Sequence, residues 1–85
     1  MAEITVYSTT WCGYCDRAKA LLKARGMEYT NINLDDDPAF RSKLLELTGR
    51  MTVPQIFIGD RLVGGFVELK ELDRQGKLAA LVEAA

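Results

Sequence analysis

The two cysteines of this chain, Cys12 and Cys15, enclose only Gly13 and Tyr14. Thiols at this spacing can close a small disulfide ring and open it again. We expect the pair at the first turn of a helix, where unpaired backbone N–H groups and the positive end of the helix dipole favour the thiolate form of Cys12. Because the thiolate is the nucleophile, the spacing predicts a site of reversible thiol–disulfide chemistry.

Hydrophobic periodicity predicts a strand, a helix and a second strand around this pair. The first strand spans Glu3 to Ser8, and the second spans Tyr29 to Leu34. Between them we expect a helix from Gly13 to about Arg25, because apolar side chains recur on one face and Gly26 follows as a stop signal. The short connections predict that the two strands pair in parallel through a right-handed crossover.

A second helix is expected after the acidic run from Asp35 to Asp37. Asp37 is suited to the N-cap, Pro38 fits the first helical position, and Gly49 ends the helix. The apolar residues that repeat at helical spacing are Phe40, Leu44 and Leu47. A metal site at the acidic run is the less favoured interpretation, because no second cluster of carboxylates accompanies it.

The last third of the chain predicts a β-hairpin and two short helices. A strand from Gln55 to Ile58 turns at Gly59-Asp60 and returns from Arg61 to Val63. Gly64-Gly65 breaks this strand, and a helix starting at Phe66 or Val67 runs to Asp73. The residues expected to pack inward from this helix and the final one are Phe66, Leu69, Leu72, Leu78, Leu81 and Val82. The order β-α-β-α-β-β-α-α predicts one α/β domain over residues 1–85, with helices on both faces of a four-stranded mixed sheet.

Composition restricts the classes of function. The formal net charge of −1 gives no attraction to nucleic acid or to a membrane surface. We find neither an apolar run long enough to cross a bilayer nor a secretory signal at Met1, so we expect a cytoplasmic protein, in which lasting disulfides are rare. The chain has no histidine, which excludes Cys/His zinc sites and histidine-dependent proteases.

The two cysteines are expected to differ in role. Cys12, at the helix entrance, is the candidate nucleophile, and Cys15, one turn later and more buried, would resolve the mixed disulfide. The alternative, a pair of inert buried thiols, is disfavoured because Gly13 and the preceding Thr9-Thr10-Trp11 indicate an exposed junction between loop and helix.

Two further segments are candidates for binding. Thr52-Val53-Pro54 precedes a strand, where a proline without an N–H group belongs, and these residues alone favour an ordinary trans proline. The backbone N–H groups of Gly64-Gly65-Phe66-Val67 can bind a carboxylate at the start of a helix. Taken alone, however, two glycines before a helix indicate only a turn.

These features together resemble the glutaredoxin family, specifically its short bacterial dithiol type, over nearly the whole chain. The segments that carry the resemblance are Tyr7-Ser8, Cys12-Gly13-Tyr14-Cys15, Arg17 to Leu22, Gly49-Arg50, Thr52 to Ile58, and Val63 to Phe66 with Leu69 and Leu72. The resemblance implies a thioredoxin-like fold, and it implies glutathione as the reductant and co-substrate.

The resemblance also implies which residues bind glutathione. Pro54 would be cis and would face the cysteine sulfur, and Val53 would pair its backbone with the cysteinyl part of glutathione as an added strand does. The γ-glutamyl carboxylate would bind at Gly65 and the residues after it. Arg41 matches a position that pairs with the glycyl carboxylate, although a solvated charge is an equally open interpretation. The glutathione-binding residues so implied are Tyr14, Arg41, Thr52, Val53, Pro54, Gly65, Phe66 and Val67.

The sequence departs from the family pattern at several positions. Gly13 replaces the usual proline, which loosens the turn and leaves an extra N–H group near the first sulfur. Thr9 stands where a lysine is common, and Val67 stands where an acidic or hydroxyl side chain is common. Trp11 is also unusual for the family. It is either a docking surface for protein partners or a partly exposed aromatic side chain packed on the loop.

Three functions are consistent with these residues. The first is a monomeric, glutathione-dependent thiol–disulfide oxidoreductase acting on protein disulfides and glutathionylated proteins. The second is a dimer in which two glutathiones and two copies of Cys12 hold a [2Fe–2S] cluster, which Gly13 and Trp11 suggest through resemblance to cluster-binding relatives. The third is a thioredoxin-like hydrogen donor, for instance to ribonucleotide reductase, which Thr9 favours and which Gly64-Gly65 and Arg41 oppose. No other metal, nucleic acid or membrane partner is expected.

Overall fold

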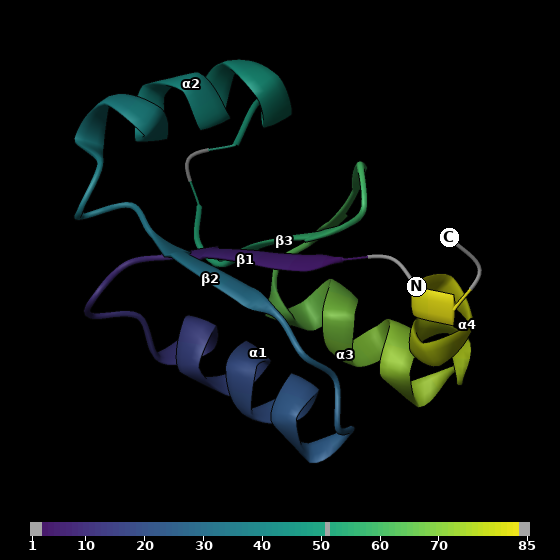
Figure 1. Ribbon diagram of the computed structural model, residues 1–85. Helices are drawn as coiled ribbons and strands as arrows, with labels where there is room; N and C mark the ends of the chain where they lie inside the picture. The colour runs from purple at the N-terminus through teal and green to yellow at the C-terminus, as the bar shows by residue number, and fades with distance from the viewer. Residues whose placement is uncertain (1–2, 51, 84–85) are drawn as a thin grey trace.

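The computed structural model of the chain describes residues 3–50 and 52–83, and its elements follow the expected order. Their bounds are β1 (Ile4–Ser8), α1 (Gly13–Ala24), β2 (Thr30–Asn33), α2 (Pro38–Thr48), β3 (Gln55–Ile58), β4 (Arg61–Gly64), α3 (Phe66–Arg74) and α4 (Lys77–Glu83). Figure 1 shows the sheet as a middle layer, with α2 on one face and α1 and α3 on the other. Within the described residues no helix is long and apolar enough to cross a membrane.

The four strands form one mixed sheet in the order β2-β1-β3-β4. Strand β1 pairs with β2 in parallel, as the strand–helix–strand pattern predicted, and with β3 in the antiparallel sense. Strands β3 and β4 form the predicted hairpin around Gly59-Asp60. Because β1 and β3 run in opposite directions, the end of β1 lies beside the start of β3, with Tyr7 opposite Gln55.

The main hydrophobic core lies between the sheet and the helices α1, α3 and α4. Side chains alternate along β1, so that Ile4 and Val6 point into this core and are almost completely buried. The buried members of the cluster are Ile4, Val6, Ala18, Leu22, Ile56, Ile58, Leu69, Leu78 and Val82. The inward residues predicted for the last two helices are confirmed, since Phe66, Leu72 and Leu81 pack against the same cluster.

The opposite face of the sheet is covered by α2. The Tyr7 ring of β1 stacks on Phe40 of α2 at 5.5 Å between centroids and meets Phe57 of β3 edge-on at 5.6 Å. Leu44, also in α2, is fully buried. The expectation that Leu47 belongs to this apolar face is wrong, because its side chain is 68% exposed. Leu47 lies in the last turn of α2, and helical spacing alone does not show where a helix extends past the sheet.

Local capping signals explain where α2 begins and ends. The carboxylate of Asp37 accepts the backbone N–H of Phe40, and Pro38 occupies the first helical position, as predicted. Gly49 ends the helix in the left-handed region at φ 71°. The predicted break at Gly64-Gly65 needs a correction, because Gly64 is still the last residue of β4, opposite Ile56 across a register shift.

Candidate redox site

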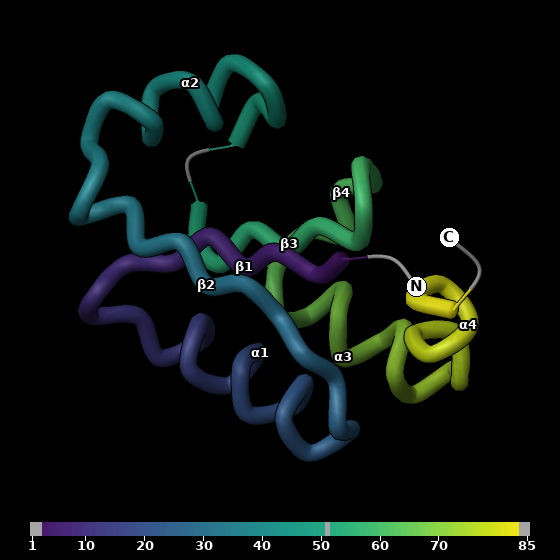
Figure 2. Tube along the Cα trace, in the orientation of Figure 1, coloured from purple at the N-terminus to yellow at the C-terminus, as the bar shows by residue number. Residues whose placement is uncertain are grey.

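Three segments meet at one end of the sheet. They are the loop between β1 and α1, the residues that lead into β3, and the junction between β4 and α3. The pairing register requires this arrangement, because Tyr7 lies opposite Gln55 and Ile56 lies opposite Gly64. Figure 2 shows the loop after β1 and the chain entering β3 at this same end. The sequence therefore brings its cysteines, its Thr-Val-Pro segment and its paired glycines together through the topology of the sheet.

Cys12 is the N-cap residue of α1. Its backbone is extended, and its Sγ accepts the backbone N–H of Cys15 at 3.2 Å. Cys12 is partly exposed, whereas Cys15 is fully buried, and both are free thiols. A sulfur at the N-terminus of a helix, in contact with a backbone donor, occupies a position that favours negative charge.

The environment of Cys15 keeps its sulfur protonated. Burial, followed by the hydrogen bond to Cys12, raises the pKa of the Cys15 thiol from its ordinary 9.0 to about 12. The backbone of Thr9 and the charge of Lys19 act in the opposite direction as smaller effects. The two sulfurs therefore differ as expected, with an accessible one at the helix entrance and a neutral thiol beneath it.

The segment before β3 contacts the accessible sulfur. Cys12 Sγ lies 3.8 Å from the carbonyl oxygen of Val53. The Val53–Pro54 peptide bond is cis, as the family resemblance implied, although the residues alone favoured a trans proline. Pro54 is buried, and Thr52 is exposed just before it. The Thr-Val-Pro segment thus presents backbone groups directly beside the sulfur.

The N-terminus of α3 is close to the same segment. Gly65 is its N-cap, where the residue has no side chain to accept a backbone N–H, and a Cβ on Gly65 would lie 3.5 Å from the Pro54 carbonyl oxygen. The N–H groups of the first turn therefore remain suited to a carboxylate from a ligand. The carboxylate of Glu68 in that turn lies 3.4 Å from the guanidinium of Arg50.

Aromatic side chains link α1 with α3 at this end. The Tyr14 ring lies 6.2 Å from the Phe66 ring, and the guanidinium of Arg17 lies 5.4 Å from the Tyr14 centroid. Tyr14 and Val67 are both more than half exposed. Trp11 is 93% exposed, which contradicts the interpretation that it packs on the loop and leaves the docking interpretation as the prediction.

Arg41 lies on the other side of the sheet from these aromatic rings. It is exposed near the start of α2 and lines a cavity of about 130 Å³ together with Ser42 and Gln55. Gln55, which directly follows Pro54, is the residue of this lining nearest in sequence to the Thr-Val-Pro segment. Arg41 and the residues at the starts of α1 and α3 therefore lie on opposite faces of the sheet, at the end of the sheet where the cysteines are.

Sequence reasoning missed the contact that anchors the cysteine loop. Asp35 was interpreted as part of a solvated helix start, but its carboxylate accepts the backbone N–H of Thr10 at 2.8 Å. This bond lowers the pKa of Asp35, and the side-chain amide of Asn33 donates to the Thr10 hydroxyl at 3.2 Å. The two contacts join the loop after β1 to the loop after β2. No local signal marks a pair separated by 25 positions.

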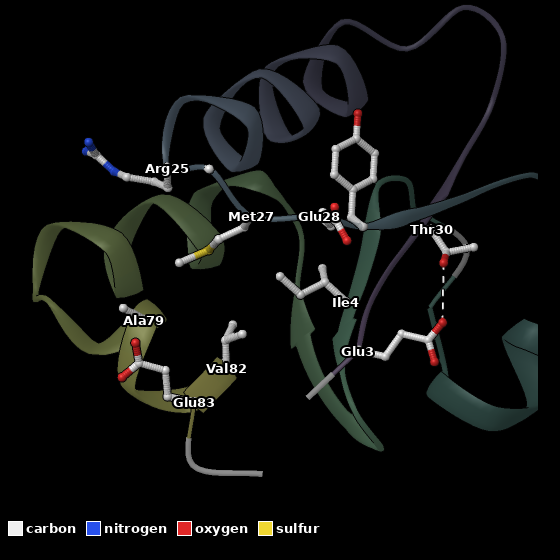
Figure 3. A pocket seen from close by; sticks show the side chains of 11 residues that line it. Glu3, Ile4, Arg25, Met27, Glu28, Thr30, Ala79, Val82 and Glu83 are labelled. Carbon is white, nitrogen blue, oxygen red and sulfur yellow. Dashed lines mark hydrogen bonds between the residues drawn. The ribbon is translucent and has the colours of Figure 1, made fainter. Parts of the chain in front are cut away.

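A large cavity lined by described residues is far from the cysteines. It measures about 810 Å³ and lies at the start of β1, between the end of α1 and α4. Figure 3 shows Ile4, Met27 and Val82 in its lining, with the carboxylates of Glu3 and Glu83 beside them. Cavity size alone therefore does not locate the redox site. Among the described residues no group of three or more metal-ligating side chains is arranged around a common point.

Comparisons with known proteins agree with the fold. A family model described as glutaredoxin matches residues 4–63. A glutaredoxin of Pseudomonas aeruginosa is 45% identical over 99% of this chain and 100% of its own length, and glutaredoxin 3 of Escherichia coli K12 is 40% identical over 98% and 100%. The crystal structure of a buckwheat glutaredoxin–glutathione complex superimposes with a TM-score of 0.91 at 38% identity, covering 98% of this chain and 78% of that chain.

The fold and the dithiol together define a class of protein. A thioredoxin-like α/β fold that carries a Cys-x-x-Cys pair at the start of its first helix is that of a thiol–disulfide oxidoreductase. The family model and the high identity over whole relatives narrow this class further. The chain belongs to the glutaredoxin family.

Proposed function

We propose that this protein is a glutathione-dependent oxidoreductase that reduces glutathione mixed disulfides and protein disulfides, as a monomer in the cytoplasm. The observation that carries the proposal is the partly exposed Cys12 sulfur at the N-terminus of α1, 3.8 Å from the Val53 carbonyl oxygen. The buckwheat relative, whose structure is a complex with glutathione, supports this tripeptide as the electron donor.

Glutathione would lie across the three segments that meet beside Cys12. The backbone of Val53, flanked by Thr52 and Pro54, would pair with its cysteinyl residue in the manner of an added strand. The N–H groups at the start of α3, from Gly65 to Val67, would bind the γ-glutamyl carboxylate. Tyr14 would cover one side of the tripeptide, and Arg41 would attract the glycyl carboxylate from the side of α2.

The first reaction needs only one cysteine. The Cys12 thiolate attacks the glutathione sulfur of a protein–glutathione disulfide, forms a Cys12–glutathione disulfide and releases the protein thiolate, which takes a proton from water. A second glutathione thiolate then attacks the glutathione sulfur bound to Cys12. The products are oxidised glutathione and the Cys12 thiolate. Each turnover consumes one reduced glutathione, because the other half of the oxidised glutathione arrives in the mixed disulfide.

Reduction of a protein disulfide needs both cysteines. Cys12 forms a mixed disulfide with the protein, and the Cys15 sulfur then attacks Cys12, expels the protein as a thiolate and leaves a Cys12–Cys15 disulfide. Two glutathione thiols in turn reduce this disulfide and leave as oxidised glutathione. Burial holds the pKa of Cys15 high, and the charge and hydrogen bond of the Cys12 sulfur add to it. Once Cys12 is part of a disulfide its negative charge is gone, so Cys15 loses a proton more readily at the step where it must attack.

The Cys15→Ser variant separates these two reactions. It retains Cys12 and the glutathione-binding segments, so we expect it to deglutathionylate a peptide at a rate within about threefold of the wild type. Reduction of a protein disulfide should fall at least about tenfold, because no second thiol completes the exchange. Both rates are measured with glutathione as the only reductant, and Cys12→Ser is the inactive control.

The opposite pattern would refute the scheme. Loss of deglutathionylation in Cys15→Ser, with the variant folded, would show that Cys12 and glutathione are not sufficient for this reaction. Turnover supported by thioredoxin reductase but not by glutathione would instead favour the thioredoxin-like hydrogen donor.

A further inference from the structure

Gln55, the first residue of β3, is a buried amide whose side chain holds the preceding loop. It is only 2% exposed, and its Nε2 donates to the backbone carbonyl of Arg50 at 2.9 Å. This bond closes the chain between the end of α2 and the start of β3. The segment inside the closed ring contains Thr52, Val53 and Pro54, and the Val53 carbonyl is the one beside Cys12 Sγ.

The carbonyl oxygen of the same side-chain amide lowers the stability of the fold. Within the described residues Gln55 Oε1 is buried and has no hydrogen-bond partner. An unsatisfied buried acceptor destabilises a fold, and this cost offsets the net gain from the bond to Arg50. An apolar side chain of similar size at this position would therefore be no worse for stability.

The position of the Gln55 side chain suggests a functional reason for a buried amide here. Gln55 lines the cavity of about 130 Å³ beside α2 together with Arg50, the residue whose carbonyl it holds. Arg50 has further contacts: the Thr48 hydroxyl accepts its backbone N–H at 3.2 Å and lies 3.4 Å from its carbonyl oxygen, and its guanidinium lies 3.4 Å from the Glu68 carboxylate. The Thr48 contacts stay within the end of α2, and the Glu68 pair holds only the side chain of Arg50. The Gln55 bond is the contact that reaches from β3 back over the Thr-Val-Pro segment.

We propose that Gln55 is a positioning residue: by holding the Arg50 carbonyl, it fixes the segment 52–54, and with it the backbone of Val53, relative to the Cys12 sulfur. Its effect on substrate rests on the proposed function, because it is the tripeptide that would pair with Val53. Gln55 acts through this segment and does not touch the reacting sulfurs.

The Gln55→Met variant tests the proposal, because methionine keeps the size of the side chain and removes both polar groups. With a glutathionylated peptide and glutathione, we expect the KM for the peptide to rise about fivefold, while kcat stays within about twofold. The free energy of unfolding in urea should equal or exceed that of the wild type. The matched control is Gln75→Met, which makes the same change at an exposed glutamine that bonds Glu71, and its KM should not change.

A second readout does not depend on turnover. Hydrogen exchange of the peptide containing residues 50–54 should be faster in Gln55→Met than in the wild type and Gln75→Met. If the wild type showed no glutathione-dependent turnover, the proposed function would fail, and exchange would still decide the role of Gln55.

An unchanged KM and unchanged exchange in Gln55→Met would overturn the proposal, as would lower stability with an unchanged KM. Should Gln55→Met not fold, Gln55→Glu decides. It keeps the length of the side chain and sets a carboxylate oxygen against the Arg50 carbonyl, so KM must rise at least as far. An unchanged KM in this variant would be equally decisive against the proposal.

Discussion

At the scale of single residues, the two cysteines acquire different properties from one turn of helix. Cys12 is the N-cap and stays partly exposed, whereas Cys15 lies on the inner face of α1 and is fully buried. Cys15 is buried because it shares the inner face of α1 with Ala18 and Leu22, whereas Cys12 precedes the first helical residue. The asymmetry is therefore a consequence of local geometry, and the sequence predicts it.

The buried thiol of Cys15 should make stability depend on alkaline pH. Its pKa is raised from 9.0 to about 12 in the folded state, so the folded protein holds this proton more tightly than the unfolded chain. The resulting stability is fully present below pH 9 and is lost as the pH rises through about 12.

The measurement compares the free energy of unfolding of the wild type with that of Cys15→Ser between pH 8 and about 11. Tyrosines and lysines titrate in both proteins, so the difference between the two curves isolates the thiol. We expect the difference to shrink steadily as the pH rises above 9. Parallel curves would contradict a protonated, buried Cys15.

At the scale of elements, the junction from β4 into α3 is built on two glycines with different constraints. Gly64 has φ 122°, a conformation that L side chains rarely adopt, and a Cβ there would lie 2.9 Å from the Glu68 carboxylate. Gly65 has φ −96°, and a Cβ there would make only ordinary contact with Pro54. The adjacent positions therefore provide a matched pair of substitutions.

We expect Gly64→Ala to lower the free energy of unfolding by about 1–3 kcal/mol, because of its strained backbone. Gly65→Ala should change it by less than about 1 kcal/mol, since its backbone conformation suits alanine. Urea unfolding of the two variants measures both values. Equal losses of stability in the two variants would show that the positive φ of Gly64 does not determine which residue this junction tolerates.

The boundaries of elements were predictable where the signal is local. The Asp37 cap, Pro38 and the stop at Gly49 are all within α2 or next to it, and the structure has each one as expected. Leu47 was misassigned because periodicity describes the face of a helix and not the extent of its partner layer. The anchor from Asp35 to Thr10 was missed because it joins two loops that only the sheet brings together.

At the scale of the whole molecule, the sheet order explains why the site is where it is. Strand β1 lies between β2 and β3, so the cysteine loop is flanked by the loop before α2 on one side and by the Thr-Val-Pro segment on the other. The element pattern predicted the layers, and family resemblance predicted the cis proline. The glutathione-binding segments that the resemblance implies stay a prediction. The clamp of Gln55 on Arg50 was not predictable, since an amide in a strand carries no signal for its partner.

Colour and mass in solution distinguish the proposed monomer from a cluster-bridged dimer. In the dimer, Cys12 of each copy would be a ligand of [2Fe–2S], and the protein would be coloured when prepared without oxygen. We expect a colourless protein that sediments at the mass of one chain in the presence of glutathione. A visible absorption band that disappears together with the dimer on exposure to air would establish the alternative.

The central claim is that Cys12 is the reactive, accessible sulfur and Cys15 the shielded thiol beneath it. The most direct test treats the reduced protein at neutral pH with a small amount of iodoacetamide for a short time and locates the modified residue by fragmentation in a mass spectrometer. We predict that Cys12 carries at least about 90% of the label, because the thiolate is the reactive form and only this sulfur is exposed. Label divided equally between the two cysteines, or found mainly on Cys15, would contradict the account.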